Sequence, residues 1–199
     1  MGLSVGVFGG AFDPPHVGHV ALARAAVEQF GLRRLLVQVV ADPGHKEVDT
    51  AADIRLRLAT LAFADVPGAS VELDPHARTV DSLEALPLDD PLFLVGADEF
   101  SSFLGWKAPQ RVLELARLGV ATRPGYPRER LDAVLGALSR PERVLVFPIE
   151  PHPVSSSQIR QLVADGVPVD DLVPAAVAKE IARLGLYRTK REGDYTEGE

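Results

Sequence analysis

The chain has 199 residues, with 28 acidic and 21 basic side chains, a formal net charge of −7 and no cysteine. This length suits about one domain, and a content of 46% hydrophobic and 25% charged residues is typical of globular proteins, which argues against a disordered chain. The acidic balance disfavours a general nucleic-acid binder, and the lack of cysteine excludes thiol nucleophiles, disulfide frameworks and thiolate metal sites.

Apolar, β-branched segments alternate with helical patterns along nearly the whole chain. Strands are predicted at residues 3–8, 35–40, 71–73, 92–95, 119–122 and 144–147. Helices are predicted at residues 16–30, 52–64, 79–86, 108–118, 129–138, 156–164 and 174–185. Thr79 is expected to cap one helix, and Ser156 or Ser157 another. Because this alternation gives right-handed crossovers, we expect an α/β fold: a doubly wound, Rossmann-like parallel sheet with helices on both faces.

We expect residues 1–188 to form a single domain and the polar residues 189–199 to fray as a C-terminal tail. No apolar run approaches the roughly 20 residues of a membrane span, and the first residues lack the basic region of a secretory signal. The sequence therefore favours a cytoplasmic protein with neither a membrane nor a nucleic acid as its partner.

The segment after the first predicted strand has the composition of a phosphate-binding turn. Gly9 and Gly10 permit positive φ and let backbone amides approach an anion closely. His16 and His19 follow at the start of a predicted helix, where unpaired N–H groups and the helix dipole favour phosphate oxygens. Either histidine alone could be an ordinary, partly buried side chain. A histidine pair also suits zinc, but no third ligand lies close by in sequence.

A second anion-binding pattern lies near the carboxyl end of the chain. Ser155, Ser156 and Ser157 place hydroxyls and amides at the start of a predicted helix, and Arg160 follows one turn later. Such a serine cluster alone is usually only a helix cap. Combined with the histidine pair, it completes an anion site from both ends of the chain.

The two patterns together resemble the nucleotidyltransferase superfamily with the His-x-Gly-His signature, whose second signature is Ile-Ser-Ser-Thr-x-Ile-Arg. Within it, residues 3–187 are similar to bacterial nicotinate-nucleotide adenylyltransferases. Further segments carry this similarity: 42–46 (Asp-Pro-Gly-His-Lys), 57–62 with its Arg-Leu pattern, 79–83, Gly96-Ala97-Asp98 followed by Trp106, Arg123-Pro124-Gly125, and Tyr187 at the family's final Gly-Leu-Tyr.

The resemblance implies adenylyl transfer from ATP to nicotinate mononucleotide, which gives deamido-NAD and pyrophosphate in NAD biosynthesis. It implies Mg²⁺ bound with ATP and no metal ligands dedicated to it in the chain. The residues that it implies are His16, His19 and Arg160 for catalysis; Gly9, Gly10, Phe12, Lys46, Asp98, Ser155, Ser156 and Ser157 for ATP and phosphate; and Thr79, Trp106 and Arg123 for the mononucleotide. The phosphate monoester has a second pKa near 6 and is largely dianionic at neutral pH, so its attack needs no general base.

For several of these residues, a purely structural role is an alternative to the functional one. Asp98 could be a helix cap, Trp106 a core residue and Lys46 a solvated lysine. Three segments depart from the family pattern: Ala11 removes a hydroxyl from the turn after the first strand, Arg78 stands where tyrosine is usual, and Asp42-Pro43-Gly44 replaces a more regular Pro-Pro segment before His45 and Lys46. The alternatives are an adenylyltransferase for nicotinamide mononucleotide or phosphopantetheine, a non-catalytic ATP-binding protein, and a general phosphate-binding module.

Overall fold

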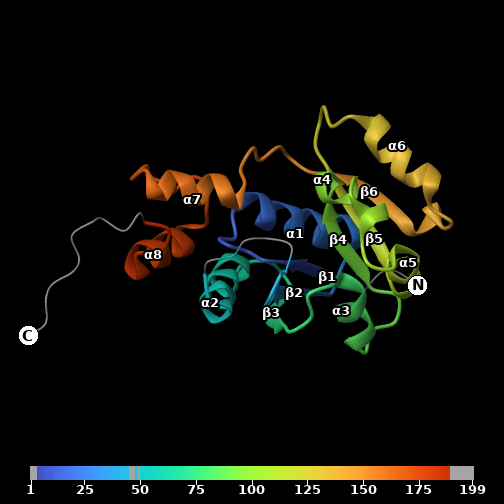
Figure 1. The fold of residues 1–199 in the computed structure, drawn as a ribbon, viewed down its shortest axis with the longest axis horizontal. Coiled ribbons are helices and arrows are strands. Elements are labelled where there is room, and N and C mark those ends of the chain that lie inside the picture. The colour runs from blue at the N-terminus through green and yellow to red at the C-terminus, as the bar shows by residue number, and fades with distance from the viewer. Residues whose placement is uncertain (1–3, 45–47, 49, 189–199) are drawn as a thin grey trace, which may run out of the picture.

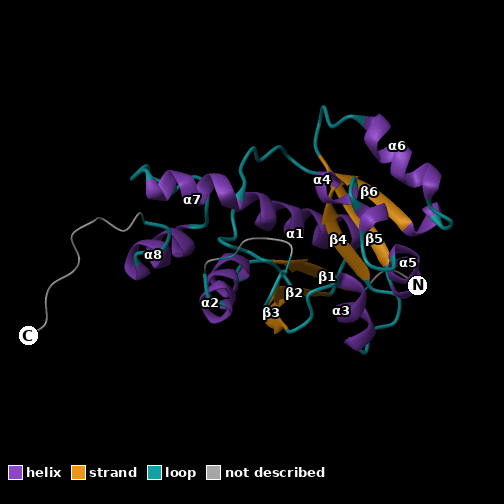
Figure 2. Cartoon of the chain, viewed as in Figure 1, coloured by secondary structure: helices purple, strands orange, loops and turns teal. Residues whose placement is uncertain are grey.

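The structure, a computed structural model, describes residues 4–44, 48 and 50–188. Its strands form one parallel sheet in the order β3-β2-β1-β4-β5-β6 (Figures 1 and 2). They are β1 (Val5–Gly10), β2 (Arg34–Val40), β3 (Ala69–Asp74), β4 (Leu92–Gly96), β5 (Arg117–Thr122) and β6 (Val144–Pro148). The expected parallel α/β fold is confirmed.

The helices connect the strands and extend beyond the last one. They are α1 (Val17–Phe30), α2 (Ala52–Phe63), α3 (Thr79–Ala85), α4 (Ala97–Phe100), α5 (Pro109–Leu115), α6 (Arg128–Ala137), α7 (Ser156–Ala164) and α8 (Ala175–Leu184), with 3-10 turns η1 (Phe103–Gly105) and η2 (Pro141–Arg143). The prediction of a helix over 108–118 was wrong at its end. Ala116 is extended, and the Arg117 N–H donates to Pro91 O at 2.9 Å, so the strand begins there.

Side chains of successive strand residues enter two separate cores, one on each face of the sheet. In β2, Val37 and Val39 lie in the core that contains buried residues of α1, α2, α7 and α8. Leu36, between them, lies in the core of α3, α5 and α6. Strands buried on both faces read as continuous apolar runs, which is why they could be located from the sequence.

The strand order reverses at β1, whose neighbours are β2 on one side and β4 on the other. In parallel sheets of this kind, ligands bind outside the carboxyl ends of the strands at such a switch point. The turn after β1 and the start of α4 after β4 both lie at this edge.

Helices α7 and α8, which come last in the sequence, lie beside the start of α1, the first helix (Figure 1). The Val17 N–H donates to Leu172 O at 3.0 Å, and Arg57 of α2 forms an ion pair with Glu180 of α8. Within residues 4–44, 48 and 50–188, no helix is long and apolar enough to cross a membrane. The boundary of a single domain at residue 188 stays a prediction, and the expected tail lies outside the described residues.

Candidate active site

The turn after β1 is shaped by Phe12 rather than by the two glycines before it. Gly9 and Gly10 end the strand without positive φ, and Phe12 has the left-handed backbone, with a φ of 50°. The conformational freedom that the glycines permit is therefore not used here. A Cβ on Gly10 would lie 2.9 Å from the Phe12 ring, which is buried and meets the Phe63 ring edge-on at 5.4 Å between centroids. Gly10 therefore supplies space for the aromatic ring under the turn.

The two histidines stack at the start of α1. Their ring centroids are 3.7 Å apart and their planes differ by 25°. His16 is the N-cap residue, and its backbone N–H donates to Nδ1 of His19 at 3.2 Å. Because Nδ1 of neutral His19 accepts, its ring proton resides on Nε2. That N–H is a donor of the kind that a phosphate oxygen requires.

Gly18, between the histidines, has a steric reason to lack a side chain. A Cβ there would lie 3.1 Å from both Cε1 and Nδ1 of His16, and 3.4 Å from Cβ of His152 in the loop before α7. These separations are tighter than the ordinary contact distance between carbon atoms. The glycine of the His-x-Gly-His pattern thus allows the imidazole to fold back over the helix start.

His16 is buried, with 8% of its surface exposed, and its Nδ1 has no hydrogen-bond partner among the described residues. Burial, and secondarily the charge of His152, lowers the pKa of His16 from 6.5 to about 4. His16 is therefore neutral at physiological pH. His152 was missed by the sequence analysis, because nothing in its local sequence distinguishes it from a surface histidine.

The lowered pKa predicts a pH-dependent stability. Between pH 4 and 6.5 the unfolded chain binds a proton at His16 and the folded protein does not, so protonation favours unfolding. The stabilisation is complete above about pH 6.5 and is lost as the pH falls toward 4, at up to roughly 1.4 kcal/mol per pH unit. Denaturant unfolding of H16Q should show a flatter pH dependence of the unfolding free energy across this window. Equal slopes in the two proteins would contradict the assignment.

Helix α7 meets the phosphate turn through its first residues. Arg160 Nη1 donates to Asp13 O at 2.7 Å, and Ser156 Oγ donates to Pro14 O at 2.8 Å. Ser155, not Ser156 or Ser157 as predicted, is the N-cap residue, and its Oγ accepts from the Gln158 N–H at 3.2 Å. The two helix starts, one from each end of the chain, therefore share one turn.

The serine hydroxyls mostly have protein partners. The Ser157 Oγ accepts from Arg160 Nη2 at 3.4 Å, and the Ser156 hydroxyl is committed to the turn. This arrangement differs from the expectation that all three hydroxyls face a phosphate. Arg160 is left as the cation of α7 that stands at the turn.

Asp13 is the buried centre of this arrangement, which sequence analysis did not single out. It is 3% exposed, its Oδ1 accepts from the Tyr187 hydroxyl at 2.6 Å, and its Oδ2 has no partner among the described residues. Burial, followed by the hydrogen bond to Asp13, raises the pKa of Tyr187, so the hydroxyl stays protonated and donates. The sequence had marked Tyr187 only by its position in the final Gly-Leu-Tyr.

A second wall of the site is built by the start of α3 and the segment after η1. Lys107 Nζ lies 2.7 and 2.9 Å from the two carboxylate oxygens of Asp81, which ties the segment to α3. Trp106 is half-buried, with its ring edge-on to Phe103 at 5.2 Å and to Phe93 at 6.3 Å. The wall leaves part of the only indole in the chain accessible.

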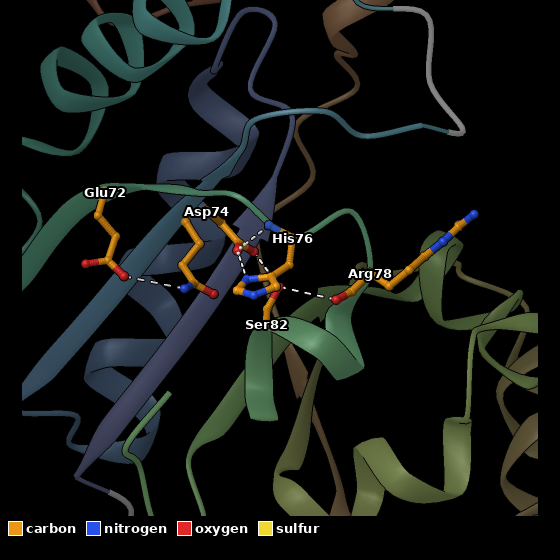
Figure 3. Close-up of polar contacts among 6 residues, drawn as sticks. Glu72, Asp74, His76, Arg78 and Ser82 are labelled. Atoms are coloured by element: carbon orange, nitrogen blue, oxygen red, sulfur yellow. Dashed lines mark hydrogen bonds and ion pairs between the residues drawn. The ribbon is translucent and has the colours of Figure 1, made fainter. Parts of the chain in front are cut away.

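The N-cap residue of α3 is Arg78, and Thr79 is the first helical residue, which corrects the predicted cap. The turn before the helix is held by Asp74, whose carboxylate accepts from the Ser82 hydroxyl and pairs with Nδ1 of His76 at 2.8 Å. Figure 3 shows these three side chains turned toward one another, with the Arg78 side chain extending away from them. The network thus fixes the backbone that presents Arg78 and Thr79.

Asp98 and Arg123 lie together at the carboxyl ends of β4 and β5. Asp98 is in the first turn of α4, whose N-cap is Gly96, so the capping alternative for Asp98 is wrong. Its side chain is 70% exposed, and Arg123 Nη2 lies 3.5 Å from Oδ2. An exposed carboxylate at this edge is available to accept hydrogen bonds from hydroxyl groups. The predicted phosphate contact Lys46 lies outside the described residues.

The cytidylyltransferase-like family matches residues 7–162. A protein from Thermus thermophilus is 37% identical over 195 residues, covering 94% of this chain and all of the relative, and one from Bordetella avium is 35% identical over 192 residues, covering 92% and 98%. Both carry the name "Probable nicotinate-nucleotide adenylyltransferase". The chain belongs to the nicotinate-nucleotide adenylyltransferase family.

Solved structures of low sequence identity share the family's fold. The nicotinic acid mononucleotide adenylyltransferase of Plasmodium falciparum complexed with NaAD has a TM-score of 0.71 at 15% identity and covers 93% of this chain and 97% of its own. A second structure of that protein, complexed with APC, gives a TM-score of 0.68.

Nucleotidyltransferases of this family generally use a divalent metal ion with ATP. In the part of the chain that the structure describes, no group of three or more histidine, aspartate or glutamate side chains could hold a metal ion. The side chains at the turn are two imidazoles, the guanidinium of Arg160 and the buried carboxylate of Asp13, and the first three suit phosphate oxygens. These residues fit the phosphates of a nucleotide, with which such an ion would be bound.

Proposed function

We propose that the chain transfers the adenylyl group of ATP to nicotinate mononucleotide. An oxygen of the mononucleotide phosphate attacks the α-phosphorus of ATP, the bond to the β-phosphate oxygen breaks, and deamido-NAD and pyrophosphate are formed. The observation that carries this proposal is the meeting of the His16–His19 pair with Arg160 at the turn 11–14, where Arg160 Nη1 and Asp13 O are 2.7 Å apart.

The attacking phosphate is already dianionic at neutral pH, so the protein has to align the reactants and stabilise charge. His19, with its proton on Nε2, donates to the triphosphate as charge moves onto the leaving pyrophosphate. Arg160 holds the β- and γ-phosphates, with the amides at the start of α7 beside it. Mg²⁺ bound with ATP would neutralise part of that charge. The cytoplasmic location expected from the sequence belongs to the same proposal.

The mononucleotide is assigned to the wall made by Trp106 and the start of α3. The accessible face of the indole suits stacking on a pyridine ring. Thr79 and Arg78 stand at the N-terminus of α3, and the exposed guanidinium of Arg78 favours a ring that carries a carboxylate. The ribose hydroxyls are assigned to Asp98, which Arg123 accompanies.

Replacing Trp106 by alanine should raise the KM for the mononucleotide about tenfold or more, because stacking on an aromatic ring contributes on the order of 1–3 kcal/mol. The KM for ATP should change little. W106F is the matched control, since it keeps a smaller aromatic face. Steady-state kinetics with each substrate varied in turn measures both constants. A change in the KM for ATP alone would show that the pyridine ring binds elsewhere.

An acceptor panel tests the function directly. Pyrophosphate release is measured with ATP and Mg²⁺ alone, and then with nicotinate mononucleotide, nicotinamide mononucleotide or phosphopantetheine. We expect release only with a mononucleotide, and the highest kcat/KM with the nicotinate form. Preference for another acceptor would overturn the substrate assignment but would leave adenylyl transfer as the reaction. ATP binding without release for any acceptor would favour the non-catalytic alternative.

A further inference from the structure

Arg55 is a buried cation with an unusual set of partners. It lies on α2, it is 1% exposed, and among the described residues its guanidinium donates to four backbone carbonyls and to no side chain. Nε donates to Thr50 O at 3.0 Å, and Nη2 donates to Ala41 O at 2.7 Å. Nη1 donates at 2.8 Å to both Ala11 O and Val40 O. Burying a charge is costly, and these four acceptors are the direct compensation that the described protein supplies.

The four carbonyls belong to segments that are distant in sequence and adjacent at the ligand edge of the sheet. Val40 ends β2 and Ala41 follows it, while Thr50 precedes Ala51, the N-cap residue of α2. Ala11 belongs to the turn after β1, at the switch point where the phosphate is assigned. One planar group therefore sets the positions of the ends of two neighbouring strands relative to each other.

The bond to Ala11 has a consequence for the amide that follows. In a trans peptide the C=O and the next N–H point in opposite directions. The Ala11–Phe12 bond is not among the cis peptides of the described chain. With the Ala11 oxygen held toward the guanidinium beneath the turn, the Phe12 N–H is directed to the other side. Phe12 also has a left-handed backbone, with a φ of 50°, so its amide lies at the bend of the turn.

Lysine could not make the same contacts. Its ammonium is a single point with three donors, whereas the acceptors here surround a flat group with five N–H donors in a fixed geometry. Burial lowers the pKa of Arg55, and the nearby carboxylates of Asp13 and Asp42 oppose that shift. The guanidinium keeps its charge because an arginine pKa stays far above neutral pH.

We propose that Arg55 is a positioning residue that aligns the Phe12 amide for a nucleotide phosphate by holding the turn after β1 against the end of β2. It acts without touching the substrate. The inference rests on the proposed function only in taking a nucleotide phosphate as the ligand of the turn, and it does not depend on which acceptor the enzyme uses. It assigns a role to a residue of α2 that the resemblance to the family had not marked.

The variant R55K tests the proposal, with R57K as the matched control. Arg57 lies on the same helix, its side chain is 60% exposed, and a lysine there keeps the ion pair with Glu180. ATP binding is measured by calorimetry without acceptor, well below the midpoint of thermal unfolding. We expect R55K to weaken ATP binding or to lower kcat by about 10–100-fold, the scale of misplacing a reacting group, and R57K to stay within about twofold. Because no acceptor is needed for binding, failure of the acceptor assignment would leave this result intact.

A lower unfolding midpoint with unchanged ATP affinity and unchanged kcat in R55K would show a merely structural role and overturn the proposal. If R55K does not fold, the wild-type protein still gives an answer. Hydrogen exchange of the Phe12 amide, followed by NMR, should slow markedly when ATP is added. An exchange rate that ATP does not change would overturn the proposal as well.

Discussion

Replacing His19 by alanine is expected to lower kcat by roughly 10²–10³-fold, the effect of removing one preorganised donor from a transition state that gains charge. The expected donor is the Nε2–H, because Nδ1 already accepts the His16 backbone N–H at 3.2 Å. The affinity for ATP should fall much less than kcat, since the charge on the leaving oxygens develops mainly in the transition state. Rapid-quench measurement of a single turnover isolates this chemical step.

The control for H19A is a pair of amide substitutions. The side-chain nitrogen of glutamine approximates the place of Nε2, and that of asparagine approximates the place of Nδ1. H19Q should therefore recover part of the lost rate, and H19N should behave like H19A. An unchanged turnover in a folded H19A protein would remove His19 from the chemistry.

Replacing Arg160 by alanine should reduce kcat/KM for ATP by about 10²-fold or more. The guanidinium is the cation of α7 at the turn, and it also holds Asp13 O at 2.7 Å, so alanine removes a phosphate partner and a support together. R160K separates the two effects because it keeps the charge and loses the planar donor set. We expect R160K to lie between the wild type and R160A.

The matched control for R160A is R128A, which removes an arginine whose side chain is 87% exposed on α6. Its kcat/KM for ATP should stay within about twofold of the wild type. Steady-state kinetics with ATP varied at saturating mononucleotide measures all three variants. A loss in R160A no greater than that in R128A would place the triphosphate away from α7.

The inner strands such as β2 and β4 could be predicted because they are buried on both faces and read as continuous apolar runs, whereas the edge strand β3 is mostly exposed and was predicted only over 71–73. The two signatures, one from each end of the chain, also predicted that the starts of two distant helices would come together, and Arg160 Nη1 lies 2.7 Å from Asp13 O in the turn before α1. The sequence could not show why residue 10 has to be glycine, because the Phe12 ring that a side chain there would meet is positioned by tertiary packing. The capping residue of α7 was missed by one position, since adjacent serines are equivalent in a sequence pattern.

Helix α2 carries two arginines, and the periodicity of its apolar residues distinguishes them, although the sequence analysis did not use it. The resemblance to the family was placed on Arg57, whose side chain is exposed, while Arg55 is buried. Arg55, Leu58, Ala59 and Ala62 follow the i, i+3, i+4, i+7 spacing of a buried helix face, and all four are buried. A charged residue in a core position is rarely tolerated without a dedicated set of partners. Periodicity would therefore have selected Arg55, although not the carbonyls that it holds.

The hydrogen bond between Tyr187 and Asp13 joins residues 174 positions apart. Since Asp13 also depends on Arg160 for its carbonyl, the turn near the first strand is completed only by the last helices of the chain. These two partners lie 147 and 174 positions further along the chain than Asp13, so the geometry of the turn is set by the tertiary fold and not by the segment after β1 alone.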